Sequence, residues 1–382
     1  MPPFQDTPSK RAIAFGRQEW NGAFGDLGTD LPLLAGMILT TKLDAASVLI
    51  LFGVMQILTG LLYRIPMPVQ PLKAMATLVI SQHLSGNILF GGGIAIGLTM
   101  GILAVSGVLD LLAKWIALPV VRGLQLGLAI QLGLLALKDY AARDGLSGYA
   151  LAFVAFLLIL LLQRRAYPAA LFALGLGVLY AIFVSPDSAR LTLDALLPSL
   201  SLPKLYAPTL EDITQGFILL ALPQLALSIG NSILATQRAV QDLFPSTALS
   251  VRRIGLSYAA MNLFAPLFSG VPVCHGVGGL AGHYAFGART GGSVIIYGGF
   301  YVLFGLLFSG SFDALLHAFP MPLLGVMLFF EAVALSRVAL TPVQSERDFG
   351  ICALTALIVL GLPYGFLVGL LLGSLAYYAL KS

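Results

Sequence analysis

Long apolar stretches, separated by short polar connections, run through almost the whole of this 382-residue chain. A helix needs about 20 apolar residues to cross a bilayer, and helices satisfy their own backbone hydrogen bonds there. The pattern therefore predicts an all-α integral membrane protein with about fourteen segments, at 20–40, 44–63, 70–82, 90–113, 119–138, 146–163, 168–185, 213–236, 248–268, 274–287, 293–310, 320–337, 348–361 and 363–380.

The segments 70–82 and 274–287 are short, and each is the third segment of its half. Prolines precede both, and proline fixes φ and removes a backbone donor. Interrupted segments at matching positions in two halves indicate a transporter site, and an odd number of segments per half makes the repeat inverted. We expect a 7+7 inverted repeat, with 1–185 as the first repeat, 186–212 as an external linker loop and 213–382 as the second repeat.

The second short segment lies in a glycine-rich stretch, 270–292, where an extended arm is expected to lead into a half-helix near Cys274 to Gly279. A helix that begins inside the membrane leaves its first N–H groups unpaired and its positive dipole end in a dry medium. Both effects favour an anion. The alternative is a re-entrant loop or tight glycine packing without a ligand.

The first segment carries two carboxylates, Asp26 and Asp30, at a depth where acidic groups are costly and indicate ion or proton handling. At a spacing of four residues they share one helix face. Alternatively, one of them caps a broken helix or pairs with Lys73.

Composition narrows the class of protein further. The chain is 58% hydrophobic and 10% charged, with a mean hydropathy of +0.93, so no sizeable soluble domain fits. Its formal charge of +4 comes from basic residues scattered between segments, which argues against nucleic acid and places both termini in the cytoplasm. No phosphate-binding loop appears, and the two cysteines have no zinc spacing, so we expect no cofactor and no metal.

Two motifs carry a family resemblance: NGAFGDLGT at 21–29 and PVCHGVGGLAGHYAFGARTGG at 272–292. Together they resemble the signatures of the molybdate transporter family, a branch of the sulfate permease superfamily, here without the C-terminal regulatory domain. The resemblance implies core and gate domains, with two half-helices that face each other across an oxyanion site. It also implies secondary active import of molybdate, or of a similar tetrahedral oxyanion, by alternating access.

The resemblance also suggests the residues of the site. Backbone and side-chain contacts to the substrate are expected from Asn21, Asp26, Val69, Gln70, Lys73, Gln224, Ser228, Cys274, His275, Gly276, Val277 and Gly278. Candidates for coupling to a proton or another cation are Asp26, Asp30 and His275, whereas Arg289 and Glu331 are expected as anchor or gate residues. Lys73 either contacts the substrate, neutralises Asp26 or extends outward.

Other functions fit parts of the pattern. One is a carrier of sulfate or another anion within the same superfamily, and another is a passive anion channel. A third is an intramembrane enzyme with Cys274 as nucleophile and His275 as base, although we expect no catalytic residue. The expected setting is a bacterial inner membrane, and a homodimer is a further expectation.

Overall fold

The structure is a computed structural model that describes residues 12–163, 169–183, 197–340 and 345–380. The start of the expected linker at 186–212 lies outside the described residues, as do the basic residues Lys10, Arg11, Arg164 and Arg165. The described chain is mostly helical, as its apolar pattern predicts.

The first half begins with a broken helix and contains the first short segment. Its elements are α1 (Arg17–Ala23), α2 (Leu27–Thr41), α3 (Ala45–Tyr63), β1 (Gln70–Pro71), α4 (Lys73–Gln82), α5 (Gly86–Ser106), α6 (Val108–Trp115), α7 (Leu118–Leu135), the π-helix η1 (Ala136–Tyr140), α8 (Gly145–Gln163) and α9 (Ala169–Phe183).

The second half follows a similar order. Its elements are α11 (Leu210–Gly216), η3 (Phe217–Ala221), α12 (Leu222–Leu227), η4 (Ser228–Ala235), α13 (Thr236–Leu243), α14 (Val251–Phe264), η5 (Ala265–Phe268), β2 (Val273–Cys274), α15 (Val277–Ala285), α16 (Gly292–Leu307), α17 (Ser309–Ala318), α18 (Met321–Leu340), α19 (Glu346–Gly361) and α20 (Gly365–Ala379).

Among the described residues, six helices are long and apolar enough to cross a membrane, or seven if α16 and α17 count as one bent span. These two helices meet at an angle of 97°. The segments expected at 20–40, 168–185 and 363–380 appear instead as shorter apolar helices. The structure therefore supports a membrane protein with six or seven clear spans.

Several boundaries differ from the sequence prediction for identifiable reasons. The first segment is broken, because the residues between α1 and α2 leave the helix and Asp26 takes the N-cap position of α2. The segment expected at 90–113 bends at Gly107, whose φ of 77° suits glycine, and α6 follows. The prediction also missed α17. The segment expected at 213–236 extends over Leu210–Leu243 and includes two π-helical stretches, η3 and η4.

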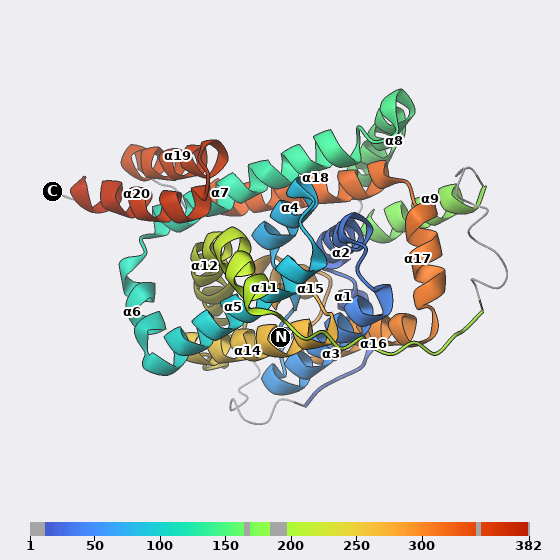
Figure 1. Cartoon of the computed structure of the whole chain (residues 1–382), viewed down its shortest axis with the longest axis horizontal. Coiled ribbons are helices and arrows are strands. Elements are labelled where there is room, and N and C mark those ends of the chain that lie inside the picture. Colours follow the sequence, from blue (N-terminus) through green and yellow to red (C-terminus); the bar gives the residue numbers. More distant parts are fainter. Residues whose placement is uncertain (1–11, 164–168, 184–196, 341–344, 381–382) are drawn as a thin grey trace, which may run out of the picture.

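The helices form two packed groups, which Figure 1 shows on opposite sides of the molecule. In the α3 layer, α3 packs along α16 and α5 packs along α14. In the α7 layer, α7 packs against α18 and α19, with α8 and α20 beside them. The short helices α4 and α15 begin between these groups, and α4 touches α7.

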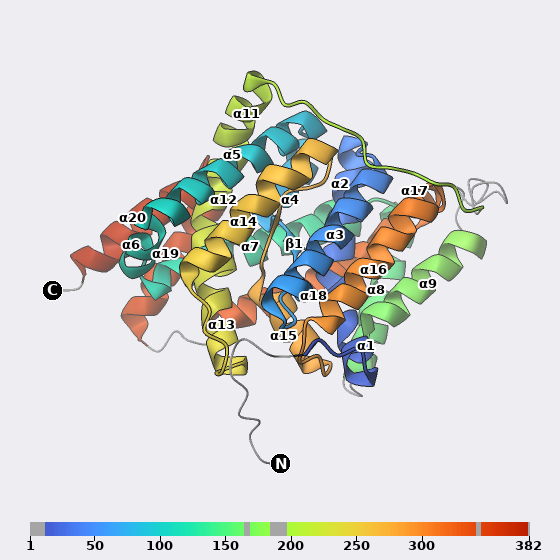
Figure 2. The same ribbon diagram turned by 90° about the horizontal axis from the view of Figure 1, so that it is seen from below.

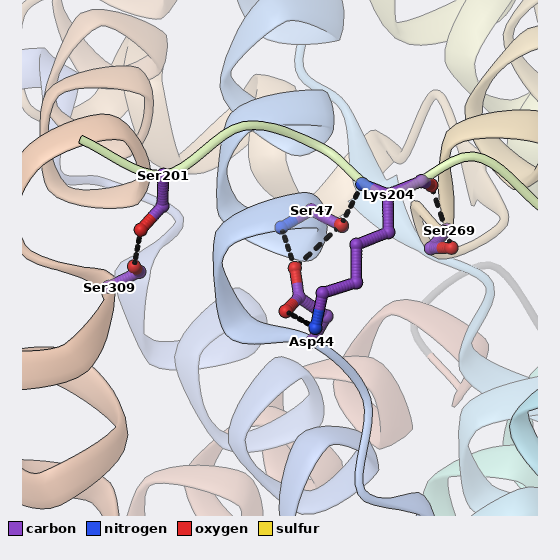
Figure 3. A network of polar contacts seen from close by, with 6 residues as sticks. All are labelled: Asp44, Ser47, Ser201, Lys204, Ser269 and Ser309. Atoms are coloured by element: carbon purple, nitrogen blue, oxygen red, sulfur yellow. Dashed lines mark hydrogen bonds and ion pairs between the residues drawn. The ribbon is translucent and has the colours of Figure 1, made fainter.

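A connection without regular structure, residues 197–209, follows one edge of the molecule before α11 begins (Figure 2). We call it the strap. Its Lys204 pairs with Asp44, at 2.6 Å between Nζ and Oδ1, and its backbone accepts from Ser269 and donates to Ser47 (Figure 3). Nearer the start of the strap, the Ser309 hydroxyl donates to the Ser201 hydroxyl at 2.9 Å. The strap is thus fixed to the ends of several elements of the α3 layer and to α17.

Candidate functional site

The two short segments meet as an antiparallel pair of strands. Gln70 pairs with Cys274 and Pro71 with Val273, and the Leu72 amide donates to the Pro272 carbonyl at 3.1 Å. Directly after the strands, α4 and α15 begin, so two helix N-termini lie near each other in the buried interior. The structure brings the two predicted half-helices together at one junction.

Side-chain amides hold both strands in the same way. Gln56 of α3 donates to the Val69 carbonyl at 2.7 Å and accepts from the Val69 amide at 3.1 Å. Asn262 of α14 donates to the Val273 carbonyl at 2.7 Å and accepts from the Val273 amide at 2.9 Å. Both amides are fully buried, and the sequence analysis overlooked them. The missed signal was an amide side chain among apolar residues, within α3 for Gln56 and in the last turn of α14 for Asn262.

We call the Gln56 and Asn262 side chains the amide clamps. The strands that they hold, and the helices that follow, lie at a constant offset along the sequence. Pro68-Val69 and Pro272-Val273 lie 204 residues apart (272 − 68), and so do the first helical residues Lys73 and Val277 (277 − 73). With the Val69 backbone engaged by Gln56, that residue has no free backbone group for a substrate.

The N-terminus of α4 is already capped by a side chain. The Oε1 atom of Gln224 accepts from the amides of Ala74 and Met75, at 3.0 and 3.2 Å. The Nε2 atom of Gln224 donates to Ser228, whose hydroxyl lies 2.8 Å from that of Tyr258. We expected Gln224 and Ser228 to donate to a substrate, but here both serve a buried network that stabilises α4.

The N-terminus of α15 differs, because its N-cap residue Gly276 provides no side-chain cap. In the described part of the chain, the amides of Val277, Gly278 and Gly279 have no acceptor. Gly278 is exposed and Val277 is half-buried, so this helix tip is accessible. It carries the unpaired, positively polarised amides that favour an anion.

Lys73 brings a full positive charge to this tip from the first position of α4. It is 5% exposed and forms an ion pair and hydrogen bond with Glu331 of α18, whose side chain is 15% exposed. A Cβ atom on Gly278 would lie 3.8 Å from the Glu331 carboxylate and 4.0 Å from the Lys73 ammonium. The pair therefore lies beside the open amides of α15 and joins α4 to the α7 layer.

Asp26 lies on the other side of the same tip. It accepts two hydrogen bonds from the Gln70 side chain, at 2.6 and 2.7 Å, and is 3% exposed. Only a glycine fits at position 279, because a Cβ atom there would collide with the Asp26 carboxylate and with Pro68. A Cβ atom on Gly276 would collide with Gln70 in the same way.

Asp30 lies one turn further along α2 in a different environment. Its Oδ2 accepts from the Tyr297 hydroxyl at 3.1 Å, and that hydroxyl lies 3.0 Å from the hydroxyl of Tyr301. Its Oδ1 is buried without a partner. The ring of His283 packs edge-on against Tyr297, so Asp30 belongs to a tyrosine cluster on α16.

The ring of His275 is held by other protein groups. Its Nδ1 lies 3.1 Å from the Pro68 carbonyl, its Nε2 lies 2.8 Å from the Ser257 hydroxyl, and its ring packs edge-on against Tyr63. Both ring nitrogens have protein partners, so the geometry gives no support to the predicted coupling role. Cys274 is buried within β2, where it pairs with Gln70.

The remaining predicted residues lie near the other end of α15. Asn21 is exposed on α1, outside the buried junction. The Arg289 guanidinium donates to the Tyr284 carbonyl at the C-terminus of α15 and stacks over the Tyr284 ring. Glu19, which the sequence analysis did not single out, accepts from the amides of Arg289, Thr290 and Ser293 where α16 begins. Among the described residues, no group of three His, Cys, Asp or Glu side chains is placed to hold a metal ion.

A polytopic helical protein with two half-helices meeting at a buried, partly uncapped junction has the architecture of a transporter. Solved structures agree on the fold. The transmembrane domain of the cyanobacterial bicarbonate transporter BicA matches with a TM-score of 0.65 at 16% identity, over 94% of this chain and 96% of that one. The murine anion transporter Slc26a9 in its inward-facing state matches with a TM-score of 0.74 at 11% identity, over 98% and 69%. The chain therefore shares the fold of these two transporters.

Sequence comparison then gives the family. The family described as "Molybdate transporter of MFS superfamily" matches residues 18–132 and 216–335. Molybdate transporter 2 of Arabidopsis thaliana is 33% identical over 93% of this chain and 86% of its own length, and Molybdate transporter 1 of the same plant is 30% identical over 95% and 88%. This chain belongs to the molybdate transporter family, and it is not an enzyme.

Proposed function

We propose that this protein imports molybdate, or a closely similar tetrahedral oxyanion, by secondary active transport with alternating access. The observation that carries the proposal is the uncapped tip of α15, with three free amides beside the buried ammonium of Lys73. Amide and ammonium donors can replace the hydration of an oxyanion, and charge-assisted hydrogen bonds are the strongest of these contacts. The relatives' names support molybdate as the substrate.

The proposed architecture is a 7+7 inverted repeat, with 1–185 and 213–382 as the two repeats and 186–212 as the external linker. The similar order of elements in the two halves and the two Pro-Val steps, 204 residues apart (272 − 68), support it. In this scheme the α3 layer and the half-helices form the core, and the α7 layer forms the gate. The core would carry the anion past the gate.

The substrate would bind at the amides of Val277, Gly278 and Gly279, with Lys73 as its cation. Asp26 touches the same tip and is our main candidate for proton or cation coupling, whereas Asp30 is a second candidate in its tyrosine cluster. With both carboxylates ionised, Lys73, Asp26 and Glu331 together carry a net charge of −1 (1 − 2). Binding a dianion there therefore requires a proton on one carboxylate or the displacement of one from the site.

Uptake of isotopic molybdate by purified protein in liposomes tests the proposal. We expect accumulation under an imposed proton or cation gradient, and weaker inhibition by sulfate than by unlabelled molybdate. Stronger inhibition by sulfate would favour the sulfate carrier, and conductance without accumulation would favour a channel. No oxyanion uptake under any gradient would reject the proposal. Full transport by Cys274→Ala would show that transport does not need the residue on which the enzyme alternative depends.

Three further expectations belong to this proposal. Both termini would lie in the cytoplasm, the protein would reside in a bacterial inner membrane, and two copies would form a homodimer. The described N-terminal region lies at the edge of the molecule opposite the strap, which agrees with an external linker and an internal N-terminus (Figure 2).

A further inference from the structure

The ion pair between Lys73 and Glu331 joins two parts of the molecule that alternating access would move apart. Lys73 is the first residue of the half-helix α4, and Glu331 lies within α18 of the α7 layer. An ion pair in a buried, low-dielectric setting is costly to break on one side only, since the remaining charge has no partner. The pair therefore holds the half-helix against the α7 layer.

The carboxylate of Glu331 also lies where a substrate anion would bind. Its Oε1 atom contacts the Lys73 ammonium and would lie 3.8 Å from a Cβ atom on Gly278, beside the open amides of α15. A carboxylate presents two partly negative oxygens to the same kinds of donor that an oxyanion uses. Glu331 thus matches the substrate in charge sign and in the donors it requires.

Three formal charges share this small region: one ammonium, on Lys73, and two carboxylates, on Asp26 and Glu331. A dianion added to this set would face strong repulsion, and its natural partner Lys73 is already occupied. We propose that Glu331 is a tethered competitor of the substrate, whose carboxylate the oxyanion displaces from Lys73. That displacement also removes the ion pair between α4 and the α7 layer, so substrate binding itself frees the half-helices to move.

This inference rests on the proposed function, and Glu331→Gln tests it. The substitution keeps the size of the side chain and removes its charge. We expect purified Glu331→Gln protein to bind molybdate about tenfold more tightly than wild type by isothermal titration calorimetry, equivalent to about 1.4 kcal/mol. Glu346→Gln removes an exposed carboxylate from α19 of the same layer and should leave the affinity unchanged.

Competition by a small carboxylate in solution provides a second readout, which a purely structural role of Glu331 would not alter. In Glu331→Ala, which removes the carboxylate and leaves space beside Lys73, formate should bind there and compete with molybdate, whereas in wild type the tethered carboxylate already fills that place. Spin labels at Ser81→Cys and Ala334→Cys, both exposed, would report the separation of α4 from α18. Molybdate should change this distance distribution in wild type, and Glu331→Gln should show the changed distribution without molybdate.

Equal or weaker molybdate binding by folded Glu331→Gln, with wild type binding normally, would overturn the inference and leave the proposed function intact. If Glu331→Gln does not fold, Glu331→Asp replaces it, because its shorter side chain weakens the contact while keeping the charge. That variant should bind molybdate more tightly than wild type, and weaker binding would also overturn the inference. A wild-type protein that binds no oxyanion would reject the proposed function and this inference with it.

Discussion

Replacing Asn262 by leucine tests whether the amide clamps position the half-helices. The side chain makes three hydrogen bonds: two with the Val273 backbone, at 2.7 and 2.9 Å, and one to the Tyr258 carbonyl at 2.8 Å. Leucine has a similar volume but leaves the Val273 amide and carbonyl unpaired in a buried place. Each unsatisfied buried group costs about 1–3 kcal/mol, although hydrogen bonds inside membrane proteins average about 0.6 kcal/mol. We therefore expect a loss of roughly 2–4 kcal/mol.

The assay is the melting temperature of the purified protein in detergent, with and without molybdate. We expect Asn262→Leu to lower it by roughly 5 °C, and to weaken the stabilisation by molybdate because the strand before α15 is no longer fixed. Gln131→Leu is the matched control, since the Gln131 amide makes one long contact of 3.4 Å to the Val359 carbonyl. Equal losses in the two variants, or wild-type stability in Asn262→Leu, would refute the clamp.

Gln224→Leu should lower stability by about 1–3 kcal/mol, because two α4 amides lose their acceptor, and Gln224→Glu should retain more stability in the same melting assay. For Asp44, burial favours a higher pKa, but hydrogen bonds from Lys204 and a neighbouring serine outweigh it and hold the pKa below its ordinary value. This stabilisation is present at neutral pH and is lost as the pH falls below about 4, so Asp44→Asn should cost about 1 kcal/mol at pH 7 and less at pH 3. Gly278→Ala should fold normally, whereas Gly279→Ala should destabilise the protein and abolish molybdate binding, because only the second methyl group would collide with a carboxylate, that of Asp26. Normal binding by Gly279→Ala would contradict the described junction.

Sequence reasoning could predict the two short segments, the extended residues that lead into them and the burial of Asp26. An interruption of an apolar segment has few explanations inside a membrane. Membership of the molybdate transporter family was confirmed, as was a helical membrane protein with the fold of known transporters, whereas the 7+7 inverted repeat stays a prediction. The partners of Gln224 and His275 were not predictable, since a polar side chain on a helix face does not reveal whether it meets a ligand or another backbone. That depends on how α12 and α14 pack against the junction, which is a tertiary contact.

The break in the first segment was predicted only as an alternative, in which Asp26 or Asp30 caps a broken helix, and the extra helix α17 was missed. Apolar content records how much surface a stretch can bury, and it does not record where the backbone turns. The break places Asp26 at the N-terminus of α2 and beside the N-terminus of α15. The apolar pattern of this segment does not distinguish such a break from a continuous helix.

The unequal treatment of the two helix tips has a consequence for how such a carrier could diversify. The tip of α4 has its amides satisfied by Gln224 and contributes the cation Lys73, while the tip of α15 leaves its amides bare. The two tips are therefore unequal, because the tip of α4 supplies a charge and the tip of α15 supplies unpaired amide donors. Substitutions around α15 could therefore change which anion is preferred without disturbing the capped tip of α4.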